Sequence, residues 1–389
     1  MNAKKLSAFA LFILITVSII PPSAQAAPFY YAGWLPFWKK QSGAQDISNN
    51  LYKFQELSPF SYEIKNGAIV DDLKLTEGFW PAWLSAIHDA GVKNIPTIAW
   101  FDGQGIQNLL SNKSKRIAQE DAIAKLVKTM GFDGIDIDYE GKLPETKQYF
   151  STFIYGLAIR LHPMGKILSC TLESRTPLTS LLGGVPKDTR TANSYPDMNK
   201  YCDEVRIMAY DQGLIDGSLD RQKGNGTLYA PVADPDWVKK TIQEALKYIS
   251  HKKIMLGIPT YGYEYEVSWS DGYTTYKRLR SFTFFQAINR ALSVGAVQER
   301  NSAGEFSFTY ATSTFIKNVS PMLTWQISST LPAVIAENSA KGLNTMFVSF
   351  SDAESAAQKI ALAKKMGLRG VAFFKLDGEQ DPFLWDKMK

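Results

Sequence analysis

The chain has 389 residues, of which 45% are hydrophobic and 13% are aromatic. This is enough apolar material for the core of one large domain or two smaller ones, and nothing points to a disordered chain. The formal charge of +5 is spread without a basic stripe or an Arg-rich helix, so nucleic acid is not an expected partner.

The first 26 residues have the three parts of a secretory signal peptide. Lys4 and Lys5 precede an apolar run over residues 8–20, and residues 24–26 form an A-x-A cleavage site. The run is too short for a comfortable membrane span. We therefore expect a secreted or cell-envelope protein that leaves the membrane after cleavage. An uncleaved N-terminal anchor is the alternative.

Short β-branched or aromatic runs then alternate with segments of helical periodicity. The runs predict strands at residues 29–33, 56–64, 94–100, 134–139, 167–172, 204–209, 254–258 and 370–374. The periodic segments predict helices that include residues 81–90, 119–130, 146–162, 237–250 and 353–366. Eight strands alternating with helices predict a parallel (β/α)8 TIM barrel over residues 27–262 and 346–389, with an open doubly wound sheet as the alternative.

Residues 263–345 break this alternation between the seventh and eighth predicted strands. The interval is rich in Tyr, Phe, Ser and Thr, and polar and aromatic residues alternate over residues 305–310. Such alternation predicts antiparallel strands. We therefore expect a small α+β insertion over the C-terminal face of the barrel.

The chain has two cysteines and three histidines. Cys170 and Cys202 lie on or before neighbouring predicted strands. The pattern is compatible either with a disulfide between them or with two free buried thiols. His88, His162 and His251 occur in unrelated contexts. No zinc site, Ser-His-Asp triad or other cofactor site is therefore expected.

Four acids fall within eight positions at the fourth predicted strand: Asp133, Asp136, Asp138 and Glu140. Because successive strand side chains point to opposite faces, the last three share one face. Carboxylates crowded on a buried face repel each other and are costly to desolvate, so this pattern favours a catalytic use. Chemistry in such a barrel lies at the C-terminal strand ends, which places Glu140 at the mouth and the other two progressively deeper.

The spacing of these acids resembles the DxxDxDxE signature of the family 18 glycoside hydrolases, the chitinase-like family. A second motif, MAYD at residues 208–211, resembles the M-x-Y-D sequence at the end of the family's sixth strand. The resemblance covers essentially the whole mature chain. It implies a TIM barrel, and the expected insertion matches the position of the small domain in one large subgroup.

The resemblance also implies a chemistry. An exported retaining glycosidase would cleave β-1,4 linkages at N-acetylglucosamine, with Glu140 as the general acid and later the base. The substrate's own acetamide oxygen would attack in place of a second carboxylate. Asp138 would orient the acetamide and Asp136 would share a proton with Asp138. Tyr210 would hydrogen-bond the acetamide carbonyl, and Asp211 would bind sugar hydroxyls or the acetamide nitrogen.

Further residues are expected around this centre. Asp133 would be a structural support beneath the site. Met208 is the first residue of the second motif and would contribute to substrate binding. Phe374 stands where the family usually carries a Trp that floors the subsite of the reacting sugar; a Phe stacks with less area. Aromatic residues near other strand ends that we expect to line the groove are Trp34, Trp38 and Trp100.

Two substrates compete, chitin with its oligomers and the glycan strands of peptidoglycan. A wide, mildly basic cleft would favour peptidoglycan, because the lactyl group of muramic acid needs room. A member of another class, a non-catalytic lectin-like protein that binds chitin, is the further alternative, and the presence of Glu140 argues against it. We expect a monomer.

Overall fold

A computed structural model describes residues 28–224, 226–270, 273–313 and 343–389, together with residues 335, 337–339 and 341. The predicted signal peptide and most of residues 314–342 therefore lie outside the described part of the chain. Trp325, which the sequence places in the insertion, is among the residues outside it.

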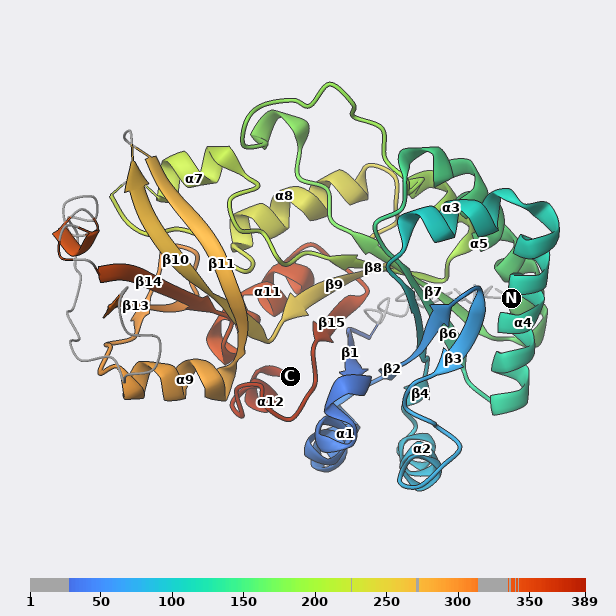
Figure 1. The fold of residues 1–389 in the computed structure, drawn as a ribbon. Coiled ribbons are helices and arrows are strands. Elements are labelled where there is room, and N and C mark those ends of the chain that lie inside the picture. Colours follow the sequence, from blue (N-terminus) through green and yellow to red (C-terminus); the bar gives the residue numbers. More distant parts are fainter. Residues whose placement is uncertain are drawn as a thin grey trace, which may run out of the picture.

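Eight parallel strands close into a barrel (Figure 1). In order around it they are β1 (Tyr30–Pro36), β2 (Glu56–Lys65), β5 (Thr97–Trp100), β6 (Gly134–Tyr139), β7 (Ile167–Glu173), β8 (Glu204–Met208), β9 (Ile254–Pro259) and β15 (Gly370–Phe374), which pairs with β1 again. The short β4 (Lys93–Asn94) pairs with β2, and β3 (Ala68–Asp71) folds back antiparallel on β2. The predicted TIM barrel is confirmed, and each of its strands overlaps a predicted one.

Helices cover the outside of the barrel. They are α1 (Ser42–Ile47), α2 (Trp80–Asp89), α3 (Gly103–Ser111), α4 (Lys113–Met130), α5 (Lys147–Leu161), α6 (Tyr195–Tyr201), α7 (Gly217–Lys223), α8 (Pro235–Leu246), α11 (Ala353–Lys365) and α12 (Leu384–Lys387). α4 starts six residues before its predicted start because the side chain of Asn112 caps it, accepting a hydrogen bond from the Lys115 N–H. Among the described helices, none is both long and apolar enough to cross a membrane.

A second, antiparallel sheet stands beside the barrel, with β10 and β11 in orange in Figure 1. Its strands run in the order β11 (Tyr273–Thr283), β10 (Tyr261–Ser270), β14 (Leu343–Phe350), β13 (Phe306–Ser313) and β12 (Glu299–Arg300), and α9 (Phe284–Ser293) packs on them. The strand expected over residues 305–310 is β13. The sheet extends beyond the expected insertion at both ends, because β10 starts at Tyr261, two residues after β9, and β14 continues to Phe350, paired with β10 over Thr345 to Phe350.

The N-terminal half of the barrel interior holds an ionic cluster. Arg206 on β8 is fully buried and lies 2.9 Å from Glu204 and 3.4 Å from Glu56. Arg369 lies within 3.3 Å of the same two carboxylates. Buried charges persist only when they are paired in this way. The cluster also contacts the acidic strand β6, because a guanidinium nitrogen of Arg206 lies 3.8 Å from Asp136.

A disulfide joins Cys170 on β7 to Cys202, which ends α6 just before β8. The Cα atoms of the pair lie 6.2 Å apart, within the usual range for a disulfide. Of the two possibilities that the sequence leaves open, the structure therefore contains the bond. The disulfide covalently links β7 to the end of α6, directly before the neighbouring strand β8.

Candidate active site

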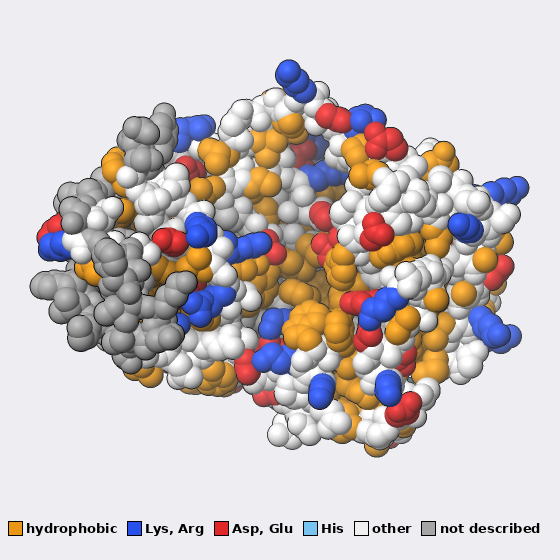
Figure 2. All heavy atoms as spheres, viewed as in Figure 1, with side chains coloured by type: hydrophobic (Ala, Val, Ile, Leu, Met, Phe, Trp, Pro, Cys, Tyr) orange, Lys and Arg blue, Asp and Glu red, His pale blue; other side chains and the backbone are white. Residues whose placement is uncertain are grey.

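A cavity of about 440 Å³ opens at the C-terminal ends of the barrel strands. Figure 2 shows a hollow with an apolar floor and acidic side chains on its wall. The residues that line the cavity are Trp34, Phe37, Trp38, Phe60, Glu63, Phe101, Asp138, Glu140, Glu173, Ser174, Met208, Tyr210, Asp211 and Phe374. Most of the site residues expected from the sequence are therefore brought together here.

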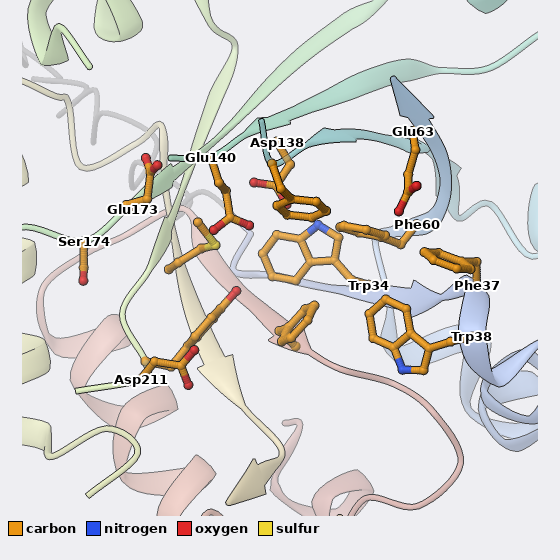
Figure 3. Close-up of a pocket in the computed structure, with 14 residues that line it drawn as sticks. Trp34, Phe37, Trp38, Phe60, Glu63, Asp138, Glu140, Glu173, Ser174 and Asp211 are labelled. Atoms are coloured by element: carbon orange, nitrogen blue, oxygen red, sulfur yellow. The ribbon is translucent and has the colours of Figure 1, made fainter. Parts of the chain in front are cut away.

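Glu140 follows the last residue of β6 and points into this cavity (Figure 3). Its N–H donates to the carbonyl oxygen of Trp100 at 2.8 Å, which fixes the backbone at the strand end. Burial and the negative charge of Glu173 raise the pKa of the Glu140 carboxyl to about 7, although Lys142 opposes the shift. A carboxyl with such a pKa keeps its proton to near neutral pH, as a general acid requires.

Asp138 lies one step deeper on the same face of β6 and is buried. Burial, and then the charges of Glu140 and Asp136, raise its pKa well above the ordinary value. Among the described residues, its Oδ1 atom is buried without a hydrogen-bond partner. A buried polar atom of this kind is costly unless a ligand completes it, so the cavity has a polar position ready for a substrate group.

Asp136 lies deepest and is surrounded by donors. Its two oxygens accept hydrogen bonds of 2.7–3.0 Å from Ser169, Thr171, Thr97 and the indole N–H of Trp34. No hydrogen bond joins Asp136 to Asp138 within the described residues. The shared proton expected from the resemblance therefore stays a prediction, and in this arrangement four donors contact the oxygens of Asp136.

Asp133 lies at the far end of β6, away from the cavity. Its Oδ2 atom accepts a 2.9 Å hydrogen bond from the N–H of Asn94, and its own N–H donates to the Asn94 carbonyl oxygen. These contacts tie β6 to the neighbouring strand position. They agree with the supporting place expected for this residue.

Tyr210 and Asp211 follow β8 and form the side of the cavity next to the insertion. Tyr210 stacks on Phe374, with ring centroids 5.6 Å apart. Burial, with the nearby charge of Asp138, raises the pKa of Tyr210 well above its ordinary value, so its hydroxyl remains a donor. Asp211 adopts a left-handed backbone (φ 61°) and accepts hydrogen bonds from the hydroxyls of Tyr261 at 2.5 Å and Tyr263 at 2.7 Å.

The aromatic residues predicted to line the groove separate into two groups. Trp34, Trp38 and Phe374 line the cavity, as does Met208. Trp100 does not, and we correct its assignment. It lies in register with Tyr139 and packs edge-on against that ring at 5.5 Å, on the face of the sheet that turns outward to the helices. Because Thr97 of the same strand points inward to Asp136, strand alternation turns Trp100 outward.

Several lining residues were not expected from the sequence. Phe37 and Phe60 pack edge-on against Trp38 at one end of the cavity, and Glu173 and Ser174 lie at the other (Figure 3). Phe101 also lines the cavity and stacks on Phe60. The sequence signal that could have found some of them is a position just after a strand end, since Phe37 follows β1, Phe101 follows β5 and Ser174 follows β7. Aromatic residues are common enough in the core that this signal alone does not single them out.

The charged residues that line the cavity are all acidic: Glu63, Asp138, Glu140, Glu173 and Asp211. An adjoining hollow towards the insertion contains Lys39 and Lys375, but each ammonium group is paired with a carboxylate, Glu379 and Asp377 respectively. The described cleft is therefore not basic. Within the described part of the chain, no group of three or more His, Cys, Asp and Glu side chains is arranged to hold a metal ion.

The sequence model described as "Glycosyl hydrolases family 18" matches residues 30–379. The chain belongs to this family. It is 24% identical to the "Uncharacterized glycosylase YvbX" of Bacillus subtilis over 83% of this chain and 80% of that protein. It is also 24% identical to chitinase A1 of Niallia circulans, over 76% of this chain and 42% of that longer protein.

Solved structures agree on the fold. The spore cortex-lytic enzyme SleL of Bacillus cereus superposes with a TM-score of 0.68 at 20% identity, over 94% of this chain and 75% of that one. A class V chitinase from Pseudomonas fluorescens Pf-5 superposes with a TM-score of 0.69 at 17% identity, over 93% of this chain and 98% of that one. With the family established, the protein is a glycosidase of the chitinase-like type.

Proposed function

We propose that this glycosidase is an exported, retaining enzyme that cleaves β-1,4 linkages next to N-acetylglucosamine in chitin oligomers by substrate-assisted catalysis. The observation that carries the proposal is the meeting of three groups in one cavity. Glu140 supplies a carboxyl with a pKa of about 7, Asp138 a buried oxygen without a partner, and Tyr210 a phenol that keeps its proton.

In the first step, Glu140 gives its proton to the glycosidic oxygen as the bond from that oxygen to the anomeric carbon breaks. The acetamide oxygen of the same sugar bonds to the anomeric carbon and forms an oxazolinium ion, the substrate-assisted route. Asp138 accepts the acetamide N–H and balances the positive charge, while the Tyr210 hydroxyl donates to the attacking oxygen. Asp211, held by two tyrosines, binds the sugar on the opposite side.

In the second step, Glu140 is a carboxylate and takes a proton from water. The water oxygen bonds to the anomeric carbon as the acetamide oxygen leaves, and the two displacements together retain the configuration. Stacking of the sugar on Phe374 and Trp34 at the cavity floor supports this geometry, since aromatic faces offer apolar area to a sugar ring.

The acidic cavity favours an uncharged glycan. Chitin carries no charge, whereas the lactyl groups and peptides of peptidoglycan bring carboxylates that Glu63, Glu173 and Asp211 would repel. Peptidoglycan is the second candidate, because SleL is named as a spore cortex-lytic enzyme and a relative from Bacillus anthracis, 24% identical over 65% of this chain, as a cortical fragment-lytic enzyme.

Export is supported by the N-terminal signal pattern and by the disulfide between Cys170 and Cys202, because disulfides persist in oxidising compartments. Every residue of the proposed mechanism comes from one chain, so we propose that the monomer acts on the glycan.

The test compares the wild type with Glu140→Gln on N-acetylglucosamine oligomers and on purified peptidoglycan, with products identified by mass spectrometry. We expect the wild type to cut the oligomers faster, and Glu140→Gln to lose at least about a hundredfold in rate while still binding them. Equal unfolding temperatures control for folding. Faster release from peptidoglycan would favour the second candidate, and binding of both glycans without release by the wild type would support the lectin-like alternative instead.

A further inference from the structure

The turn that follows Glu140 is held from several sides. Gly141 adopts a left-handed backbone (φ 64°). The N-terminus of α3 packs directly on the turn, because a Cβ atom at Gly103 would lie 2.0 Å from the Gly141 carbonyl oxygen. These contacts leave the backbone around the catalytic carboxyl little room to move.

Glu173, at the end of β7, hydrogen-bonds to this turn through its side chain. Its Oε1 atom accepts the N–H of Gly141 at 3.0 Å. Its Oε2 atom accepts a hydrogen bond from the Asn193 amide at 2.8 Å and lies 3.5 Å from the ammonium of Lys142. The carboxylate therefore contacts both residues after Glu140 and lines the same cavity as Glu140 itself.

Lys142 is the cation of this arrangement. Its side chain is fully buried, and its ammonium lies 4.7 Å from the ring centroid of Phe150. A lysine with no solvent around its charge is costly to bury, so it needs nearby carboxylates. Burial lowers the pKa of Lys142, and the charges of Glu173, Asp138 and Glu140 oppose that shift.

We propose that Glu173 and Lys142 are positioning residues that fix the turn after Glu140 and set the pH at which Glu140 carries its proton. The proposal deepens the function proposed above and rests on Glu140 as its acid. Glu173 places a like charge beside the Glu140 carboxyl, and Lys142 places an opposite one. The other charged groups around Glu140 are Asp138 on its own strand and Asp211 after β8.

The two charges have opposite consequences. Removing the negative charge with Glu173→Gln lowers the pKa of Glu140, so the alkaline limb of the pH–rate profile moves to lower pH. Removing the positive charge with Lys142→Met raises that pKa and moves the limb to higher pH. Each shift is expected to be about one pH unit, the usual effect of one charge in a partly buried site. In the double variant the two effects cancel, and the limb returns towards the wild-type position.

The experiment measures the pH dependence of kcat/KM on an N-acetylglucosamine oligomer and, without substrate, the 13C NMR titration of the Glu140 carboxyl. That carbon is assigned by its loss in Glu140→Gln. The control is Glu63→Gln, which removes a carboxylate from the other end of the cavity, and we expect its titration to match the wild type (Figure 3).

Opposite shifts of the Glu140 titration in the two single variants support the proposal. Shifts in the same direction, or unchanged titrations with reduced rates, would overturn it and leave only a structural role. Because the NMR titration needs no turnover, a wild type that cleaves no oligomer would refute the proposed function while the titrations still decide the role of the pair. If Lys142→Met does not fold, the direction of the Glu173→Gln shift is decisive.

Discussion

The hydroxyl of Tyr263, on the first strand of the insertion, donates a 2.7 Å hydrogen bond to Asp211 at the end of barrel strand β8. Tyr261 donates to the same carboxylate oxygen at 2.5 Å. The second sheet thus reaches the catalytic mouth through two side chains of β10. Asp211 also has a left-handed backbone, which is uncommon for a non-glycine residue, although Asp adopts it more often than most.

The first prediction concerns this link. The double variant Tyr261→Phe and Tyr263→Phe leaves Asp211 without both hydroxyl donors, so the carboxylate loses its fixed orientation towards the sugar. We expect kcat/KM on N-acetylglucosamine oligomers to fall by about 10- to 100-fold, corresponding to about 1.4–3 kcal/mol of lost hydrogen bonding. A double variant with wild-type kcat/KM would show that the insertion does not position Asp211.

The second prediction concerns Asp136. Asp136→Ala leaves four hydroxyl or indole donors without their acceptor inside the barrel and removes a carboxylate 3.8 Å from the buried Arg206. Removing one partner of a buried ionic cluster is strongly destabilising, so we expect the free energy of unfolding to fall by about 3–5 kcal/mol in urea denaturation. The control is Asp188→Ala, which removes an exposed carboxylate bound to Arg190 and should change little. Equal losses in the two variants would contradict the account.

The third prediction follows from the raised pKa of Glu140. Burial and Glu173 move this pKa from 4.5 to about 7, so the carboxyl binds its proton more tightly in the folded state. Its contribution to stability is complete below pH 4.5 and is lost as the pH rises through about 7. Glu140→Gln avoids that loss. It should therefore gain about 3 kcal/mol over the wild type between pH 4 and pH 8 in unfolding measurements. A difference that stays constant with pH would refute the raised pKa.

The fourth prediction concerns the disulfide. Replacing Cys170 and Cys202 by Ala removes a link that closes a loop over a sequence separation of 32 residues. In the chain-entropy model this costs about 3–4 kcal/mol of unfolding free energy. Thermal unfolding of the wild type with and without reductant gives the same comparison. Identical unfolding temperatures in both conditions would argue against a stabilising bond.

The sequence predicted the barrel well because its signals are local. Each strand is a short apolar run, and glycines such as Gly131 end helices in the left-handed conformation that few other residues adopt. The acids of β6 were placed at the mouth because strand alternation and the barrel rule need no partner strand. Boundaries shifted where a side-chain cap decides them, as at Asn112.

The rest depends on contacts between strands that are distant in the sequence. The sequence around residue 173 does not predict that Glu173 accepts a hydrogen bond from the N–H of Gly141, or that Lys142 is buried beside it. The four donors that occupy Asp136 come from three other strands, so the resemblance alone led us to expect a shared proton. The prediction for Trp100 is wrong because nearness to a strand end does not give the direction of a side chain, and Thr97 of the same strand takes the inward-facing alternation.

The central claim is that the leaving group beside Glu140 is displaced in the first of two steps, through an intermediate, and not by direct attack of water. The most direct measurement is 1H NMR of the first sugar released from an N-acetylglucosamine oligomer, recorded before the anomers equilibrate. We predict the β-anomer, the product of two successive displacements. Initial release of the α-anomer would mean a single displacement by water and would contradict the mechanism.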